Sequence, residues 1–144
     1  MEKNKLIPKN PATLENYPAL PILKGDEVAE RVHQAKQASR AWANLSFKER
    51  GRYLLKAREY LLDHLDEIAR TISEDNGKPL VESLTSDILT VCDSFTYYSK
   101  HAEKILKDEK LNIGIMEWLG RSSKIHYQPL GVVAIISPWN FPFS

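Results

Sequence analysis

The sequence predicts an α/β fold that is largely helical over its 144 residues, and three observations lead to this prediction. Apolar side chains recur at helical spacing through most of residues 25–110. Two strand-like runs surround a glycine turn in residues 111–128. Residues 131–136 form an unbroken apolar run rich in β-branched side chains, which is typical of a strand covered on both faces in a parallel sheet.

The composition is that of an ordinary globular chain and argues against several function classes. Hydrophobic residues make up 42% and charged residues 27%, with a formal net charge of +1. This balance, without a long basic run, gives no reason to expect a nucleic acid partner. No apolar segment approaches the roughly 20 residues that span a bilayer, so no membrane partner is expected. The single cysteine, Cys92, and an amino terminus without a secretory apolar core favour a cytoplasmic location.

Residues 1–24 are expected to form an extended amino-terminal arm. Prolines at positions 8, 11, 18 and 21 forbid a helix there and favour extended segments and turns. The first helix is expected to begin at Gly25-Asp26, where the aspartate can accept from the first free N–H groups. The apolar face of this helix consists of Val28, Val32, Ala35, Ser39 and Trp42.

Two further helices are expected before residue 110. Ser46 and Glu49 have the spacing of a capping box, so the second helix begins there, and Asn76-Gly77 supplies its stop. Pro79 suits the first turn of a third helix. Taken alone, three such helices are also typical of a helical bundle or coiled coil. The apolar faces are Leu54, Leu61, Leu65, Ile68 and Ile72 in the second helix, and Val81, Leu84, Ile88, Val91, Phe95, Tyr98, Ala102 and Ile105 in the third.

Residues 111–128 are expected to form a β-hairpin. The runs 111–119 and 122–128 flank Gly120-Arg121, and two strand-like runs around a glycine turn indicate a hairpin. In the second run Ile125 and Tyr127 alternate with polar side chains. A lone hairpin is only marginally stable in water.

Residues 129–144 are expected to supply a first sheet strand and a ligand-binding loop. A buried helix segment competes with the strand at 131–136, but the short length and the flanking Pro129 and Pro138 favour a strand. Pro138 ends the ladder because it has no N–H to donate. Open α/β sheets bind ligands at the carboxyl ends of such strands. A parallel strand also needs neighbours, and no other candidate is visible, so the chain is expected to be the opening part of a larger protein.

A long contiguous motif in this segment carries a family resemblance. The run from Pro129 to Pro142 reads PLGVVAIISPWNFP, and it resembles the signature of NAD(P)-dependent aldehyde dehydrogenases. Three further features resemble positions of that family, namely Arg50, Gly77-Lys78-Pro79 and the pair Tyr97-Tyr98.

The sequence departs from the family pattern at two places. Leu14 stands where the family has glycine, and Asp75-Asn76 stands where it has glutamate-threonine, which is interpreted as a surface variation. No G-x-G-x-x-G motif follows Ile136, where an ordinary dinucleotide fold would have it. The family also lacks that motif there, and has its phosphate-binding glycines after a later strand.

The resemblance implies the amino-terminal part of an aldehyde dehydrogenase-like, Rossmann-type cofactor domain. It also implies oxidation of an aldehyde substrate to a carboxylic acid, with hydride passing to NAD or NADP. Asn140 matches the family's oxyanion-hole asparagine, whose uncharged amide can donate hydrogen bonds without titrating. Phe141 matches a position that lines the substrate passage. The residues expected to seat the cofactor are Ile136, Ser137, Pro138 and Trp139.

The segment is expected to be inactive alone. The family's nucleophile and general base lie downstream of the Asn140 motif, and neither is present in this sequence. Cys92 is interpreted as a small buried hydrophobe, because it lies beside the apolar face of the third helix and buried apolar thiols are inert. The histidines are too scattered for a metal site, and no metal is expected; they are His33, His64, His101 and His126.

The resemblance divides the chain into four parts. These are an extended arm (1–24), the helical part of the cofactor-binding domain (25–110), an oligomerisation hairpin (111–128), and the first sheet strand with the active-site loop (129–144). In the family the hairpin pairs with a neighbouring subunit, so a homo-oligomer, either dimer or tetramer, is expected. Two alternatives stay open: a non-catalytic helical module for interaction or oligomerisation, derived from such an enzyme, and a free helical bundle with a frayed carboxyl-terminal tail.

Overall fold

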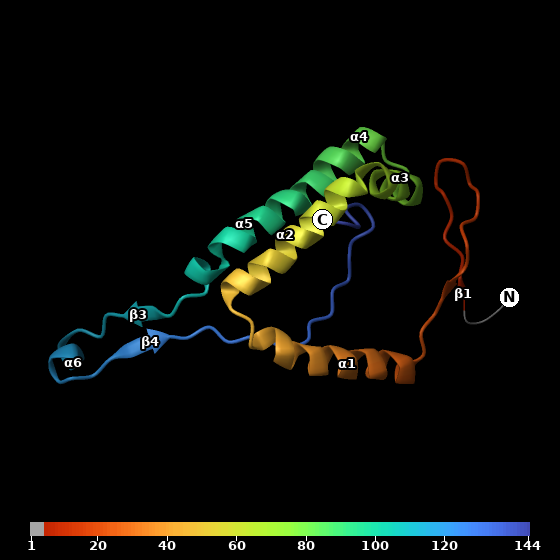
Figure 1. The fold of residues 1–144 in the computed structure, drawn as a ribbon. Helices are drawn as coiled ribbons and strands as arrows, with labels where there is room; N and C mark the ends of the chain where they lie inside the picture. Colours follow the sequence, from red (N-terminus) through yellow and green to blue (C-terminus); the bar gives the residue numbers. More distant parts are fainter. Residues whose placement is uncertain (1–4) are drawn as a thin grey trace.

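Helices make up most of the computed structural model, which describes residues 5–144 (Figure 1). Residues 1–4 of the expected amino-terminal arm lie outside the described residues. The strands of the described part pair as two separate antiparallel ladders, β1 with β2 and β3 with β4. In chain order the elements are β1 Lys5–Leu6, β2 Leu20–Pro21, α1 Gly25–Ala43, α2 Phe47–Asp63, α3 Leu65–Asn76, α4 Leu80–Glu82, the π-helix η1 Ser83–Ile88, α5 Leu89–Ile105, β3 Glu109–Leu111, α6 Ile115–Trp118 and β4 Ser123–Ile125.

The core lies between α2 and α5, which run side by side, and it extends to α3 and η1 (Figure 1). Gly51 of α2 allows the two long helices to approach closely, because a Cβ at this position would lie 2.8 Å from the main-chain oxygen of Ser99 on α5. A larger side chain at Gly51 therefore has to push the two helices apart. The buried apolar residues are Leu61, Ala69, Ile72, Ile88 and Cys92.

Local sequence signals set the ends of α2 and α3 as predicted. The Ser46 hydroxyl accepts from the Glu49 N–H at 3.2 Å, and the Glu49 carboxylate accepts from the Ser46 N–H at 2.8 Å, so the capping box is confirmed. Gly77 has φ +79° and ends α3 in the left-handed conformation. The predicted second helix is nevertheless two helices, because the backbone leaves helical geometry at His64 (φ −113°, ψ 23°).

The first helix begins at Gly25 as predicted, but its apolar face has no covering partner. The carboxylate that accepts at its start belongs to Glu27 rather than Asp26, with the Lys24 N–H as donor at 2.8 Å. No residue of α1 is buried, and the Trp42 ring makes an edge contact with Tyr53 of α2. The helical spacing therefore predicted the helix correctly, while the surface that its apolar face would pack against is not found among residues 5–144.

The predicted third helix is continuous from Leu80 to Ile105, but η1 interrupts its α-helical spacing. A π turn holds more residues than an α turn, so it rotates neighbouring positions away from a simple apolar stripe. As a result the predicted stripe residue Val81 is 61% exposed, while Ser83 and Asp87 are completely buried. The interruption therefore brings polar side chains to the inner face of the helix.

The predicted first sheet strand is not formed among residues 5–144. Residues 131–136 are assigned neither strand nor helix, and no described strand pairs with them (Figure 1). A strand exists through hydrogen bonds to a neighbouring strand, and the described residues offer none. Ile135 is 86% exposed and Ile136 is 94% exposed, so the apolar run is uncovered on both faces. The expected parallel sheet is therefore not formed within residues 5–144.

A short antiparallel ladder lies in the region of the predicted hairpin, but its strands differ from the expected runs 111–119 and 122–128. β3 pairs with β4 so that Glu109 faces Ile125 and Leu111 faces Ser123. The short helix α6 occupies most of the first predicted strand (111–119). Figure 1 shows this hairpin projecting away from the packed helices. Its expected role in oligomerisation stays a prediction.

A polar cluster joins the two sides of this hairpin at its open end. The Lys124 ammonium donates to Asp108 at 2.5 Å, and the His126 Nδ1 lies 2.5 Å from the other oxygen of the same carboxylate. The Tyr127 hydroxyl donates to Glu109 at 2.5 Å. The bond from Lys124, followed by the contact with His126, lowers the pKa of Asp108 below its ordinary value of 3.8.

We predict that acid weakens the hairpin through Asp108. Because folding lowers this pKa, the ionised carboxylate contributes stability above its unfolded pKa, and the contribution is lost as the pH falls through the folded pKa. Backbone amide shifts of Glu109 and Ile125, followed by NMR below about pH 4, should report the loss of the ladder. Asp108→Asn should remove this pH dependence, and an unchanged titration in that variant would assign the effect to another group.

The amino-terminal arm folds back on itself through a turn that strains one residue. The side-chain oxygen of Asn10 accepts from the N–H groups of Ala12 at 2.8 Å and Thr13 at 3.1 Å. Leu14 then adopts φ +64°. Among residues 5–144 it is the one non-glycine residue with a positive φ. The left-handed conformation costs a residue with a Cβ roughly 1–2 kcal/mol, so glycine suits this position better than leucine.

We predict that Leu14→Gly stabilises the fold by up to about 1 kcal/mol, because it relieves this strain and removes little buried surface. The leucine side chain is 64% exposed, so its packing contribution is small. Urea unfolding of the two chains measures the difference. Leu14→Ala is the matched control, since it shortens the side chain but keeps the Cβ. Equal stability of the glycine and alanine variants would show that the turn is not strained.

Candidate active-site loop

The last residues of the chain return from the hairpin to the helical core (Figure 1). Phe143 packs against the buried cluster of α2, α3 and η1. The three residues Trp139–Phe141, which we call the candidate active-site loop, contact the junction between α3 and α4 at Asn76–Pro79. The loop is therefore held by helix ends that lie more than sixty positions earlier in the chain, with sequence separations of 62 and 63.

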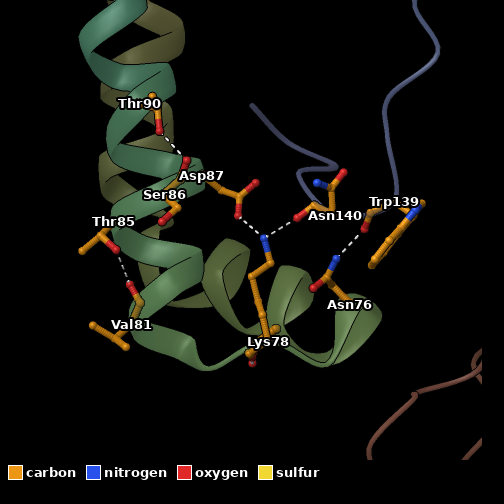
Figure 2. Close-up of polar contacts among 10 residues, drawn as sticks. Asn76, Lys78, Val81, Thr85, Ser86, Asp87, Thr90, Trp139 and Asn140 are labelled. Carbon is orange, nitrogen blue, oxygen red and sulfur yellow. Dashed lines mark hydrogen bonds and ion pairs between the residues drawn. The ribbon is translucent and has the colours of Figure 1, made fainter.

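Lys78 is the centre of this contact (Figure 2). Its ammonium donates to the Asp87 carboxylate at 2.7 Å and to the main-chain oxygen of Asn140 at 2.8 Å. The side chains of the ion pair are 8% exposed at Lys78 and 0% exposed at Asp87. The same ammonium lies 4.8 Å from the centroid of the Phe141 ring, which is a favourable cation–π distance. One cation thus binds a buried carboxylate, a main-chain carbonyl and an aromatic face.

Asp87 reaches Lys78 because η1 turns it inward. Its second carboxylate oxygen is buried without a hydrogen-bond partner among the described residues, as is the hydroxyl of Ser83 one turn earlier. A buried carboxylate is stable only when its charge is compensated, and Lys78 supplies the compensation. The position of the Lys78 side chain is therefore set by the need to neutralise Asp87.

Asn76 makes the second attachment of the loop. It is the last residue of α3, and its side-chain amide donates to the main-chain oxygen of Trp139 (Figure 2). The Ser73 hydroxyl donates to the main-chain oxygen of Lys78 at 2.6 Å and fixes the junction to α3. The interpretation of Asn76 as a surface variation is therefore corrected, because this side chain binds the loop.

The structure brings some of the sequence-predicted site residues together and leaves others apart. Asn140 and Phe141 lie around Lys78, and Trp139 is attached through its carbonyl while 86% of the residue is exposed. The Asn140 contact runs through its main-chain oxygen, and its side-chain amide binds no other described residue (Figure 2). The remaining predicted cofactor residues, Ile136, Ser137 and Pro138, are exposed and precede the attachment.

Sequence reasoning missed the residues that hold the loop. In the sequence Lys78 belongs to the Gly77-Lys78-Pro79 motif, and Asp87 belongs to no motif. Asp87 stands beside Ile88 of the predicted apolar face, which is a weak signal, because the carboxylate is buried only where the helix departs from α spacing and a cation lies nearby. Nothing in the local sequence could have paired that cation with a carbonyl at Asn140.

Cys92 lies outside the loop and has the properties of a core residue. It is 6% exposed, and burial raises the pKa of its thiol, with a smaller opposite effect from the charge of Arg58. A raised pKa leaves less of the reactive thiolate at neutral pH. Among residues 5–144 no three His, Cys, Asp or Glu side chains gather in a group that could hold a metal ion.

Comparison with known proteins identifies the family. Residues 2–144 match the family model described as the aldehyde dehydrogenase family. The chain belongs to the aldehyde dehydrogenase family. The match covers the arm, the helices, the hairpin and the loop, so the family resemblance of the loop motif is confirmed for the chain as a whole.

Two curated relatives and one solved structure illustrate the likeness. The chain is 36% identical over 147 residues to the peroxisomal aminoaldehyde dehydrogenase 1 of Pisum sativum, and the match covers 97% of this chain and 29% of that protein. It is 33% identical over 123 residues to the 4,4'-diapolycopene aldehyde oxidase of a Methylomonas species, covering 85% of this chain and 23% of that protein. An NADP-dependent enzyme of E. coli has a similar structure, with a TM-score of 0.78, 27% identity and coverage of 96% of this chain and 28% of that chain.

These figures place the chain as an aldehyde dehydrogenase segment. It spans less than a third of the length of each of these proteins, at 29%, 23% and 28%. The fold likeness to the E. coli enzyme extends over nearly the whole described chain, including parts whose apolar faces are uncovered here.

We predict that Lys78→Met lowers the free energy of unfolding by about 3–5 kcal/mol, because it leaves the buried Asp87 carboxylate without a counter-charge. The double variant Lys78→Met/Asp87→Leu should recover most of this loss, since replacing a buried pair by apolar side chains is often neutral. Urea unfolding followed by circular dichroism measures both. If the double variant were as unstable as the single one, the loss would come from something other than the stranded carboxylate.

Proposed function

We propose that the chain is the amino-terminal segment of an NAD(P)-dependent enzyme that oxidises an aldehyde to a carboxylic acid. The observation that carries this proposal is the loop of the family motif, which is anchored through its main chain while the Asn140 side-chain amide remains available. In the proposed enzyme a thiolate adds to the aldehyde carbon, and the carbonyl oxygen becomes an oxyanion. The Asn140 amide donates hydrogen bonds to that oxygen.

An amide suits this task for two physical reasons. It carries no ionisable proton, so its capacity to donate does not change with pH. A donor that is already held in place stabilises developing charge without a reorganisation cost at the moment of reaction. The two carbonyl contacts of the loop supply such fixation for the main chain of Asn140.

The residues proposed to seat the cofactor fit that role in their exposure and backbone. Ile136 and Trp139 present apolar side chains that are 94% and 86% exposed. The main-chain groups of Ile136 and Ser137 form no hydrogen bonds within the described residues, so they remain available to a ligand. Bound there, NAD or NADP would supply the acceptor for the hydride of the aldehyde carbon. Loss of that hydride from the thiolate adduct would leave a thioester, which water would hydrolyse to the carboxylic acid and the free thiolate. Support for NAD(P) use comes from the family and from the E. coli neighbour, whose name describes it as NADP dependent.

The segment alone is proposed to be inactive, because its one cysteine has the wrong environment for a nucleophile. Cys92 packs inside the helical core, away from the loop. The proposed location remains the cytoplasm, although the pea relative is named as peroxisomal.

The hairpin region 111–128 is proposed to pair with a second subunit and so to give a dimer or tetramer. Its tip carries large apolar side chains that are exposed, with Ile115 at 77%, Trp118 at 93% and Leu119 at 70%. Such a patch at the end of a projecting hairpin favours burial against another chain. The same patch supports the second candidate function, a non-catalytic interaction module. Light scattering combined with a nucleotide-binding assay separates the two. A defined oligomer without any nucleotide affinity supports the module.

The catalytic proposal is tested in a chimera in which residues 1–144 replace the matching segment of the pea aminoaldehyde dehydrogenase. We predict aldehyde-dependent reduction of NAD or NADP, and a fall in kcat of about 10²–10³-fold in Asn140→Ala. Retention of the oligomeric state and of nucleotide binding in the variant is the control for folding.

The isolated 144-residue chain provides the second half of the test. We expect no turnover with NAD or NADP and a panel of aldehydes. Turnover that disappears in Cys92→Ser would overturn the proposed division of roles, because it would make Cys92 the nucleophile. A chimera that is active and unaffected by Asn140→Ala would overturn the role of Asn140.

A further inference from the structure

We propose that Lys78 and Asn76 are positioning residues, which set the direction of the Asn140 side chain by holding the peptide groups on both sides of it. This inference rests on the proposed function of Asn140. It starts from one observation: two side chains from one helix junction bind the main-chain oxygens of two consecutive residues, Trp139 and Asn140 (Figure 2).

The geometric argument follows from the planarity of the peptide group. The oxygen of Trp139 belongs to the peptide plane before the Asn140 Cα, and the oxygen of Asn140 belongs to the plane after it. Fixing both planes fixes φ and ψ of Asn140, and therefore the direction of its Cα–Cβ bond. The side chain then retains only its own χ rotations. Anchoring two consecutive carbonyls thus limits the amide to the positions that these χ rotations reach from one fixed Cα–Cβ bond.

The anchors are themselves held by rigid elements rather than by other loops. The Lys78 ammonium is fixed by the fully buried Asp87 of η1, and Asn76 is the last residue of α3. The left-handed Gly77 between them turns the chain so that both side chains face the loop, and a Cβ at Gly77 would lie 2.7 Å from the Pro11 side chain. A site supported by helix ends in this way keeps its geometry better than one supported by flexible segments.

A simpler role for these residues is to attach the carboxyl-terminal tail without any effect on chemistry. The two roles differ in what happens when Asn140 is absent. A positioning residue acts through Asn140, so its removal has no further effect on kcat once the Asn140 amide is gone. If these residues only attach the tail, any fall in kcat on their removal is independent of Asn140 and multiplies with the fall caused by Asn140→Ala.

The attachment itself is tested in the 144-residue chain by ¹⁵N relaxation. The variant is Lys78→Met/Asp87→Leu, which removes the cation and its counter-charge together and so avoids a stranded buried carboxylate. We expect faster and larger motion at the amides of 139–141 and unchanged relaxation in α5, with the same loop effect in Asn76→Ala. Lys36→Met, an exposed lysine change on α1, is the control and should leave the loop unchanged. Unaltered loop relaxation in both anchor variants would overturn the proposal.

The effect on chemistry is tested in the pea-enzyme chimera. We expect the Lys78→Met/Asp87→Leu pair to lower kcat roughly 10–100-fold, a loss of the size that small misplacements of catalytic groups produce. The same pair in an Asn140→Ala background should cause no further fall in kcat. A full additional fall in that background would overturn the positioning role. If Asn140→Ala alone left kcat unchanged, the proposed function of Asn140 would fail, whereas the relaxation result would still decide whether the anchors hold the loop.

Discussion

The buried ion pair between Lys78 and Asp87 is the constraint on which the arrangement of this chain depends. Both side chains are removed from water, and neither charge is tolerable in that place without the other. Because the Lys78 ammonium must stay beside Asp87, the residues after α3 are held against the inner face of η1. The same ammonium binds the main-chain oxygen of Asn140 and so fixes the path of the candidate active-site loop. Two neighbouring segments, nine positions apart at Lys78 and Asp87, are thereby bound to a loop that lies 62 positions after Lys78.

The π-helix is the local feature that makes this pair possible. A regular α-helix would continue the apolar stripe through this turn and leave less room for a carboxylate on the inner face. The wider turn brings Ser83 and Asp87 to the interior, while Ile88 still packs in the core. π turns inside helices are often found at functional sites, and here the turn supplies the counter-charge for a residue that holds the proposed catalytic loop.

Much of the helical fold could be predicted from the sequence because its signals are local. The capping box at Ser46, the start at Gly25 and the stop at Gly77 each depend on neighbours within a few residues. The missing strand at 131–136, the break at His64 and the π turn could not be predicted, because each depends on what packs against the segment. In the site, the motif identified the loop residues, but the anchors lie 62 and 63 positions away from the carbonyls that they bind.

The candidate active-site loop has a fixed main chain and exposed side chains. It can therefore be ordered in this chain although residues 5–144 do not supply the groups that its side chains would bind. Trp139 and Asn140 are attached through carbonyl oxygens, which leaves the indole and the amide uncommitted. The apolar run before them is uncovered. In the proposed enzyme these uncommitted groups face the cofactor, the substrate and the strands that the described residues do not supply. Anchoring by the main chain is the arrangement that serves such a role, because it orders the loop without occupying the side chains that the chemistry requires.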